Sequence, residues 1–126
     1  MAVEFNHTLV NSRDIWAAAS SVADILGLEK PSAYGPFAVI SLANGASLDF
    51  HQADEVQQQH YAFLVSETEF DEILGRIKAR GYTYWADPMG NQPGKWNTED
   101  GGRGLYWEGP DGHFLEIITR PYGSGD

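Results

Sequence analysis

The chain has 126 residues, of which 42% are hydrophobic and 13% aromatic, so it can form a single domain with a real core but not two independent domains. It has no cysteine, which excludes disulfides and thiolate metal ligands, and its net charge of −10 makes nucleic acid an unfavourable partner. Since no apolar run suits a membrane span and no secretion signal is evident, we expect a cytoplasmic protein that does not contact a membrane.

The first half of the chain has the pattern of a strand, a helix and two or three further strands. Residues 4–12 form the first strand candidate, and apolar residues at helical spacing follow between residues 15 and 26. Gly27 is a natural helix stop. Two more strand candidates, 33–43 and 46–52, flank the pair Asn44-Gly45, which is typical of a tight hairpin.

The second half repeats this order of elements. A strand candidate at 60–66 leads to a capping box, Ser66 and Glu69, and to a helix that Gly81 ends. Its predicted buried stripe consists of Phe70, Ile73, Leu74 and Ile77. Three strands follow, the last two joined by a turn at 110–112. The sequence therefore predicts an α+β fold of two tandem βαβββ modules, at 1–54 and 57–122, with a short flexible tail at 123–126.

Each module has a histidine on its first strand, His7 or His60, and the run "FLEII" near the end of the chain has a carboxylate, Glu116, among aliphatic residues. A carboxylate in such surroundings is unfavourable unless it is paired or coordinates a metal. Because side chains alternate faces along a strand, pseudo-symmetric pairing of the modules would bring His7, His60, Asp49 and Glu116 to one concave surface. Such a site suits Fe, Mn, Ni, Co or Zn, and His51, on the same face as Asp49, could replace that residue as a ligand.

The doubled unit, its two histidines and the run "PDGHFLEI" resemble the vicinal oxygen chelate superfamily, which includes glyoxalase I, extradiol dioxygenases, fosfomycin-resistance enzymes and bleomycin-resistance proteins. The resemblance covers nearly the whole chain and implies a curved mixed sheet around a central cleft. It also implies a divalent metal ion held by His7, His60 and Glu116. Asp49 falls where glyoxalase I has another glutamate, so Asp49 and Glu116 are the candidate catalytic residues.

This resemblance implies a metal-dependent enzyme whose small-molecule substrate chelates the metal through two neighbouring oxygens, with lyase, isomerase or oxygenase chemistry. Extradiol dioxygenases have a further histidine shortly before the residues that match Leu105 and Tyr106, and its absence here disfavours ring cleavage. The few cations of the second module disfavour a fosfomycin-type site. The alternative is a non-catalytic protein that sequesters an antibiotic, as bleomycin-resistance proteins do. The resemblance also implies a homodimer, in which the two chains can share metal ligands.

The segment 87–102 has no periodicity and joins two strands, which is typical of a lid or binding loop. Trp96 in this segment either folds over a ligand or packs on its own module. His113 lies on the strand face opposite Glu116, beside the turn, and is expected to be exposed. Trp85, Tyr106 and Trp107 either line a pocket or fill the core.

Overall fold

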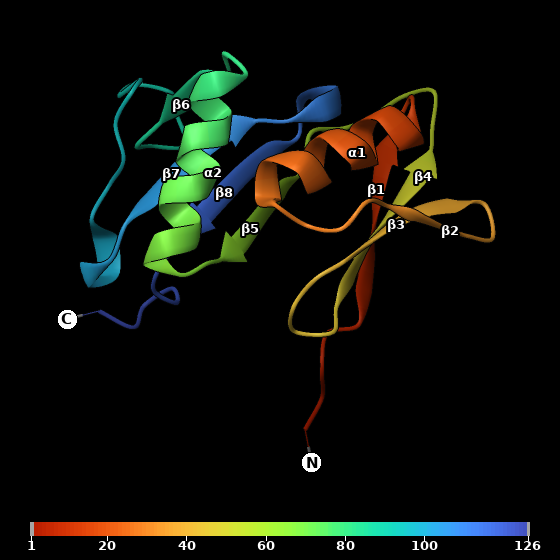
Figure 1. The fold of residues 1–126 in the computed structure, drawn as a ribbon, viewed down its shortest axis with the longest axis horizontal. Coiled ribbons are helices and arrows are strands. Elements are labelled where there is room, and N and C mark those ends of the chain that lie inside the picture. The colour runs from red at the N-terminus through yellow and green to blue at the C-terminus, as the bar shows by residue number, and fades with distance from the viewer. Residues whose placement is uncertain (1, 126) are drawn as a thin grey trace. The chain divides into compact units, whose positions relative to one another are not determined.

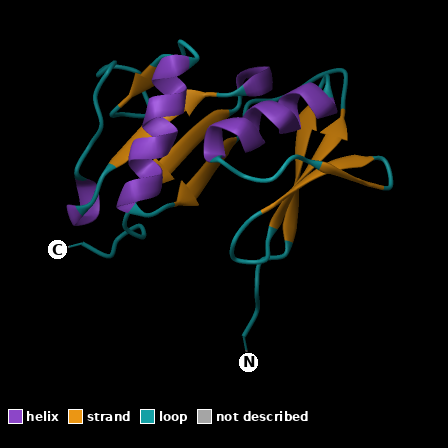
Figure 2. Ribbon diagram, in the orientation of Figure 1, coloured by secondary structure: helices purple, strands orange, loops and turns teal. Residues whose placement is uncertain are grey.

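The computed structural model describes residues 2–125 (Figures 1 and 2). The chain divides into a first unit that ends at Gln57 and a second unit that begins at Gln58. In residues 2–125 there is no helix with the length and apolar composition that crossing a membrane requires.

The first unit contains one helix and a four-stranded mixed sheet. Its elements are β1 (His7–Ser12), α1 (Ile15–Leu26), β2 (Ser32–Tyr34), β3 (Phe37–Ser41) and β4 (Ser47–Gln52). The strand order is β1-β4-β3-β2, in which β1 and β4 are parallel and the other two pairs are antiparallel.

The second unit has the same topology. Its helix and strands are β5 (His60–Leu64), α2 (Glu67–Ala79), β6 (Tyr84–Trp85), β7 (Gly104–Glu108) and β8 (Phe114–Ile118). The strand order is β5-β8-β7-β6, again with the first pair parallel and the others antiparallel. The predicted α+β fold of two tandem βαβββ modules is confirmed, and each module forms a sheet of its own.

Both helices begin where the sequence indicates, and α1 also ends there, whereas α2 ends at Ala79 with Arg80 as its cap, just before the predicted stop at Gly81. The Asp14 side chain accepts a hydrogen bond from the backbone N–H of Ala17 and caps α1, which ends at Gly27 in a left-handed conformation (φ 72°). For α2, the capping box between Ser66 and Glu69 has both of its bonds. These bonds satisfy backbone N–H groups that have no partner inside the helix, so they define where each helix starts.

One face of each sheet packs against its helix and the other is left open for a site. The α1 face is built mainly of small side chains: Ile15, Ala18, Ala19, Val22, Ala23 and Ile25. The α2 face is larger and consists of the predicted stripe, Phe70, Ile73, Leu74 and Ile77, all of it buried. On the sheets, alternate residues such as Val10, Phe50, Leu105 and Ile117 complete these two cores. The intervening residues, including His7 and His60, point to the open faces.

The turn before β8 depends on close backbone contacts. Pro110–Gly112 forms a short 3-10 turn in which Asp111 has a positive φ of 60°. A Cβ atom at Gly109 would lie 2.6 Å from Cδ1 of Leu115, which is a collision. Glycine is therefore required at position 109 by the packing of the turn on β8.

Candidate metal site

The open face of the second sheet brings together two of the predicted site residues, His60 and Glu116. On the parallel pair β5 and β8, His60 is in register with Phe114 and Ala62 with Glu116, so both polar side chains lie on one face. Glu116 is 2% exposed, whereas the side chain of His60 is 47% exposed. Nε2 of His60 lies 2.9 Å from Oε1 of Glu116.

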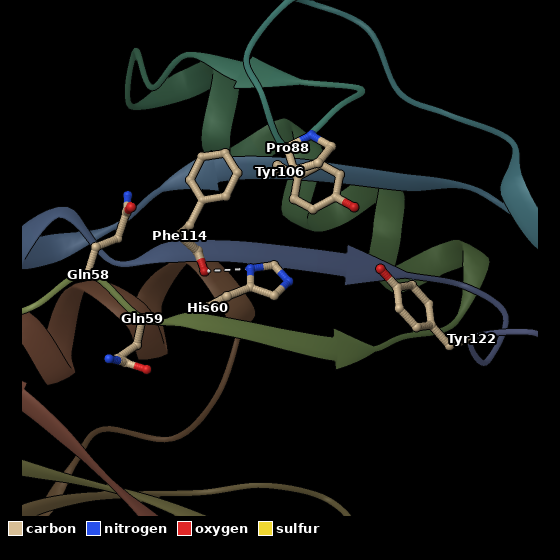
Figure 3. A pocket seen from close by; sticks show the side chains of 7 residues that line it. All are labelled: Gln58, Gln59, His60, Pro88, Tyr106, Phe114 and Tyr122. Atoms are coloured by element: carbon tan, nitrogen blue, oxygen red, sulfur yellow. Dashed lines mark hydrogen bonds between the residues drawn. The ribbon is translucent and has the colours of Figure 1, made fainter.

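The two ring nitrogens of His60 both face oxygen acceptors. Nδ1 lies 3.2 Å from the backbone carbonyl oxygen of Phe114, which can only accept, so Nδ1 has the donor proton (Figure 3). Nε2 faces the carboxylate of Glu116, a second acceptor. A proton or a metal ion must therefore lie between these two atoms.

The geometry of this pair fits a divalent ion. Two ligand atoms each about 2.1 Å from one ion, at right angles, lie about 3.0 Å apart, close to the observed separation. The bond from Nδ1 to a backbone carbonyl is the arrangement that usually orients a metal-binding histidine. Among residues 2–125, however, there is no cluster of three or more His, Asp or Glu side chains that could hold a metal ion, so this pair is a partial site.

A buried tyrosine, Tyr106 on β7, extends the polar pair. Its hydroxyl hydrogen-bonds with the carboxylate of Glu116 and with the hydroxyl of Tyr122. Burial, the charge of Glu116 and the bond with Tyr122 raise the pKa of Tyr106 well above its ordinary value of 10.0. Tyr106 therefore keeps its proton at neutral pH and donates it to Glu116.

A pocket of about 340 Å³ opens beside His60 and has mainly aromatic walls. Its lining residues are Gln58, Gln59, His60, Pro88, Tyr106, Phe114 and Tyr122 (Figure 3). The rings of Tyr106 and Phe114 stack at 15° with centroids 5.6 Å apart, and the ring of Trp85 lies 5.9 Å from that of Phe114 in a tilted arrangement. His60 lies 5.9 Å from Tyr106 and 6.3 Å from Phe114, ring centre to ring centre. A flat ligand with an oxygen-bearing edge suits these walls.

The first unit holds the other two predicted ligands, His7 and Asp49, on the open face of its own sheet. Asp49, 8% exposed, accepts a hydrogen bond from the hydroxyl of Ser47 at 2.7 Å. Nδ1 of His7 lies 2.6 Å from Oδ1 of Asn6. The two residues thus share a sheet face, as predicted, but each bonds with a polar neighbour close to it in sequence.

The remaining histidines differ from each other. His51 is exposed at the end of β4, and its Nδ1 lies 3.0 Å from Oδ1 of Asn11. The predicted exposure of His113 is wrong, because this residue is buried. Its Nδ1 accepts a hydrogen bond from the backbone N–H of Gln59, and its ring meets the edge of Tyr61. His113 therefore joins β8 to the residue before β5, which is a structural role.

The segment 87–102 contributes Pro88 to the pocket, but its tryptophan, Trp96, packs on its own unit instead of over the pocket. The ring of Trp96 meets the edge of Phe70 with centroids 6.2 Å apart. The guanidinium of Arg103 lies over the rings of both Phe70 and Trp96 and forms ion pairs with Glu67 and Asp71. Arg103 is thus engaged on the α2 side of the sheet, away from the face that holds Glu116. Of the aromatic residues left open by sequence, Trp107 fills the core and Tyr106 lines the pocket, while Trp85 contacts the pocket residue Phe114.

No family model matches the chain. A solved structure named Oxidase ChaP-H1 is 58% identical, with a TM-score of 0.94, and the match covers 97% of this chain and 99% of that one. A glutathione transferase FosA from Serratia marcescens is 26% identical over 124 residues, which are 93% of this chain and 81% of that protein. A possible glyoxalase from Bacillus cereus is 25% identical, with a TM-score of 0.71, over 94% of this chain and 100% of that one.

This chain belongs to the vicinal oxygen chelate superfamily. The near-full-length match at 58% identity is to a protein named as an oxidase, and the chain is accordingly one of the enzymes of this superfamily. The candidate site in this vicinal oxygen chelate enzyme has two further lining residues: Tyr106, which the sequence left between pocket and core, and Tyr122, which the sequence did not single out. Tyr106 had a usable signal, since alternation on β7 places it opposite Glu116 in register. Tyr122 lies outside the strands, and no sequence pattern marks it.

Proposed function

We propose that this chain is a metal-dependent oxidase that acts on a small substrate with two neighbouring oxygens. The observation that carries the proposal is the pair of facing acceptor atoms, Nε2 of His60 and Oε1 of Glu116, at 2.9 Å beside an aromatic pocket. The 58% identity to an oxidase supports oxygen chemistry in preference to lyase or isomerase chemistry.

The proposed metal ligands are His60, Glu116 and His7, with Asp49 as a further ligand or a base. His7 and Asp49 occupy the strand positions of the first unit that match His60 and Glu116 in the second. Two imidazoles and a carboxylate on one face of an ion leave positions open for a substrate, a donor set that suits iron, manganese, cobalt, nickel or zinc. Oxidase chemistry favours a redox-active ion, iron first. The homodimer with shared ligands stays a prediction.

When bound, the ion would act as a Lewis acid on the substrate oxygens and as the centre for reaction with dioxygen. The chain's own residues prepare the site. The Phe114 carbonyl orients the ring of His60, and the O–H of Tyr106 donates to Glu116 and holds that carboxylate in place. The aromatic walls bind the face of the substrate and exclude water, which strengthens the electrostatic interactions inside.

The test is the metal content of protein purified without chelator, measured by elemental analysis. We expect wild-type protein to retain about one divalent ion per chain, as one metal site requires. His60→Ala removes one ligand and should reduce the retained metal to background. The control is Tyr34→Ala, which removes an exposed aromatic side chain of the first unit that belongs to no proposed ligand set, and it should retain the metal.

Unchanged metal content in His60→Ala would contradict the proposed site. The identity of the ion separates the chemistries: iron with substrate-dependent oxygen uptake supports the oxidase, whereas zinc or nickel without oxygen uptake would favour isomerase or lyase chemistry. Metal-free wild-type protein that binds a cationic aromatic drug would favour antibiotic sequestration instead.

A further inference from the structure

The segment after β8, residues 121–125, runs beside the candidate site and is held there by Asp100. Oδ2 of Asp100 accepts a hydrogen bond from the backbone N–H of Gly123 at 3.1 Å, and Oδ1 accepts one from Gly125 at 3.2 Å. Asp100 itself has a positive φ of 56°, an uncommon backbone conformation for a residue with a side chain. Both oxygens of one carboxylate are thus used to hold this segment.

Further contacts keep the segment close to the turn that contains Asp100. The guanidinium of Arg120 donates to the carbonyl oxygen of Ser124, and the N–H of Ser124 donates to the carbonyl of Pro121. A Cβ atom at Gly125 would collide with the backbone of Asp100, so the two segments pass each other at a distance that only glycine permits. The segment is therefore docked on its unit at a defined position.

The docked segment presents one large side chain, Tyr122, to the pocket. Tyr122 is 72% exposed, yet it lines the pocket beside His60 and Tyr106. Figure 3 shows its hydroxyl turned toward that of Tyr106. The side-chain hydrogen bond between the two tyrosines contributes to the raised pKa of Tyr106. The Tyr106 hydroxyl bonds in turn with Glu116, so a continuous polar chain leads from the exposed tyrosine to the buried carboxylate.

An aromatic ring that is held at a pocket yet remains largely exposed can bury its face against a ligand without reorganising the fold. Its hydroxyl stands at the end of the polar chain, where an oxygen of the ligand can bond with it. Resting on the proposed function, we propose that Tyr122 is a substrate-binding residue that determines which oxygenated substrates the pocket accepts, and that Asp100 is the positioning residue that holds Tyr122 there.

The test uses 4-nitrocatechol, a flat probe with two neighbouring oxygens whose absorbance changes when it binds a metal ion. Titration of metal-containing wild-type protein gives the reference Kd. Tyr122→Ala removes the ring and should weaken binding about tenfold. Tyr122→Phe keeps the ring and loses one hydrogen bond, so about two- to fivefold weaker binding is expected. The matched control is Tyr34→Ala, since Tyr34 is 74% exposed and lies in the first unit; its Kd should equal that of wild type.

The role of Asp100 is tested by a double-mutant cycle. Asp100→Asn preserves side-chain size and tolerates the positive φ but replaces one acceptor oxygen with a donor, so it should weaken binding about two- to fivefold. In the Tyr122→Ala background the same change should have no further effect, because Asp100 acts only through Tyr122. An additive loss in the double variant would overturn the positioning role. Thermal unfolding of each variant shows whether the fold is intact.

Metal analysis of the same samples separates this inference from the proposed function. If wild type retains metal and Tyr122→Ala binds the probe as wild type does, the role of Tyr122 is overturned while the metal site stands. If wild type retains no metal, the proposed function fails, and quenching of tryptophan fluorescence by the probe still compares Tyr122→Ala with wild type. A wild-type protein that does not bind the probe by either readout overturns the inference.

Discussion

The two units place a histidine and a carboxylate at matching positions, but only the second unit joins them. His7 on β1 and His60 on β5 are each in register with the residue two places before the carboxylate of the neighbouring strand, Asp49 or Glu116. In the second unit the imidazole and carboxylate are 2.9 Å apart. In the first unit each group bonds with a neighbour close to it in sequence.

The residue two places before the carboxylate accounts for this difference. In the first unit it is Ser47, whose hydroxyl lies on the same face as Asp49 and donates to it at 2.7 Å. In the second unit it is Phe114, which has no hydroxyl and supplies an aromatic wall instead. Glutamate is also one methylene longer than aspartate and spans the diagonal to His60 more easily. The two open faces of the duplicated fold thus differ because the residues differ at two pairs of matching strand positions, Ser47 with Phe114 and Asp49 with Glu116.

The largest expected effect follows from removing each carboxylate in turn. Glu116→Gln preserves size but loses the charge that faces His60, and it should reduce retained metal to background in elemental analysis. Asp49→Asn should cause a smaller loss, because Ser47 already satisfies this carboxylate. Equal losses of metal in the two variants would contradict this difference between the units, since they would show that both carboxylates contribute equally to metal binding.

The buried faces of the two helices also differ, since that of α2 has larger side chains than that of α1. Truncating a core side chain should therefore lower stability most in the second unit. Phe70 is fully buried, stacks edge-on with Trp96 and lies under the guanidinium of Arg103. Phe70→Ala should lower the free energy of unfolding by about 3–5 kcal/mol, as large-to-small changes in cores do. Urea denaturation monitored by circular dichroism measures this. A loss below about 1 kcal/mol would show that this cluster packs loosely.

In the first unit, stability should be lowered most by enlarging a buried side chain of the helix. Ala19 is completely buried on α1, where three of the six buried residues are alanines, and the helix packs against β3 and β4. Ala19→Leu adds methyl groups where no space exists and should cost about 1–3 kcal/mol in the same urea experiment. The control Ser20→Leu, at the neighbouring exposed position, should change stability by no more than about 0.5 kcal/mol.

The smallest expected effect concerns Tyr106 and is a change in how the free energy of unfolding decreases above pH 10. Because burial and the charge of Glu116 raise the pKa of Tyr106 above 10.0, the folded state binds this proton more tightly than the unfolded state. The associated stability is fully present below about pH 10 and is lost as pH rises toward the folded-state pKa. Tyr106→Phe should therefore make the loss of stability above pH 10 shallower, measured by urea denaturation at a series of pH values. Tyr34→Phe is the control for the loss of one phenol group. If the free energy of unfolding depends on pH identically in the two variants, Tyr106 has no special role in stability at high pH.

Local sequence patterns were sufficient to predict most of the fold. The capping box at Ser66 and Glu69, the apolar stripe from Phe70 to Ile77 and the stop at Gly27 all depend on residues within a few positions of each other. Strand alternation also placed Glu116 on the face opposite the core, because this alternation is a property of a single strand. The duplication then made the order of elements in the second half predictable from the first.

The sequence by itself determined the two modules, their helices and the faces on which His60 and Glu116 lie, since these follow from short-range backbone geometry and hydrophobic periodicity. Only the tertiary structure decided that His60 contacts Glu116, that His113 is buried beneath the residue before β5, and that Tyr122 reaches the pocket. Each of these depends on which distant segments become neighbours. The packing of the whole unit decides which segments become neighbours, and no short stretch of the sequence contains that information.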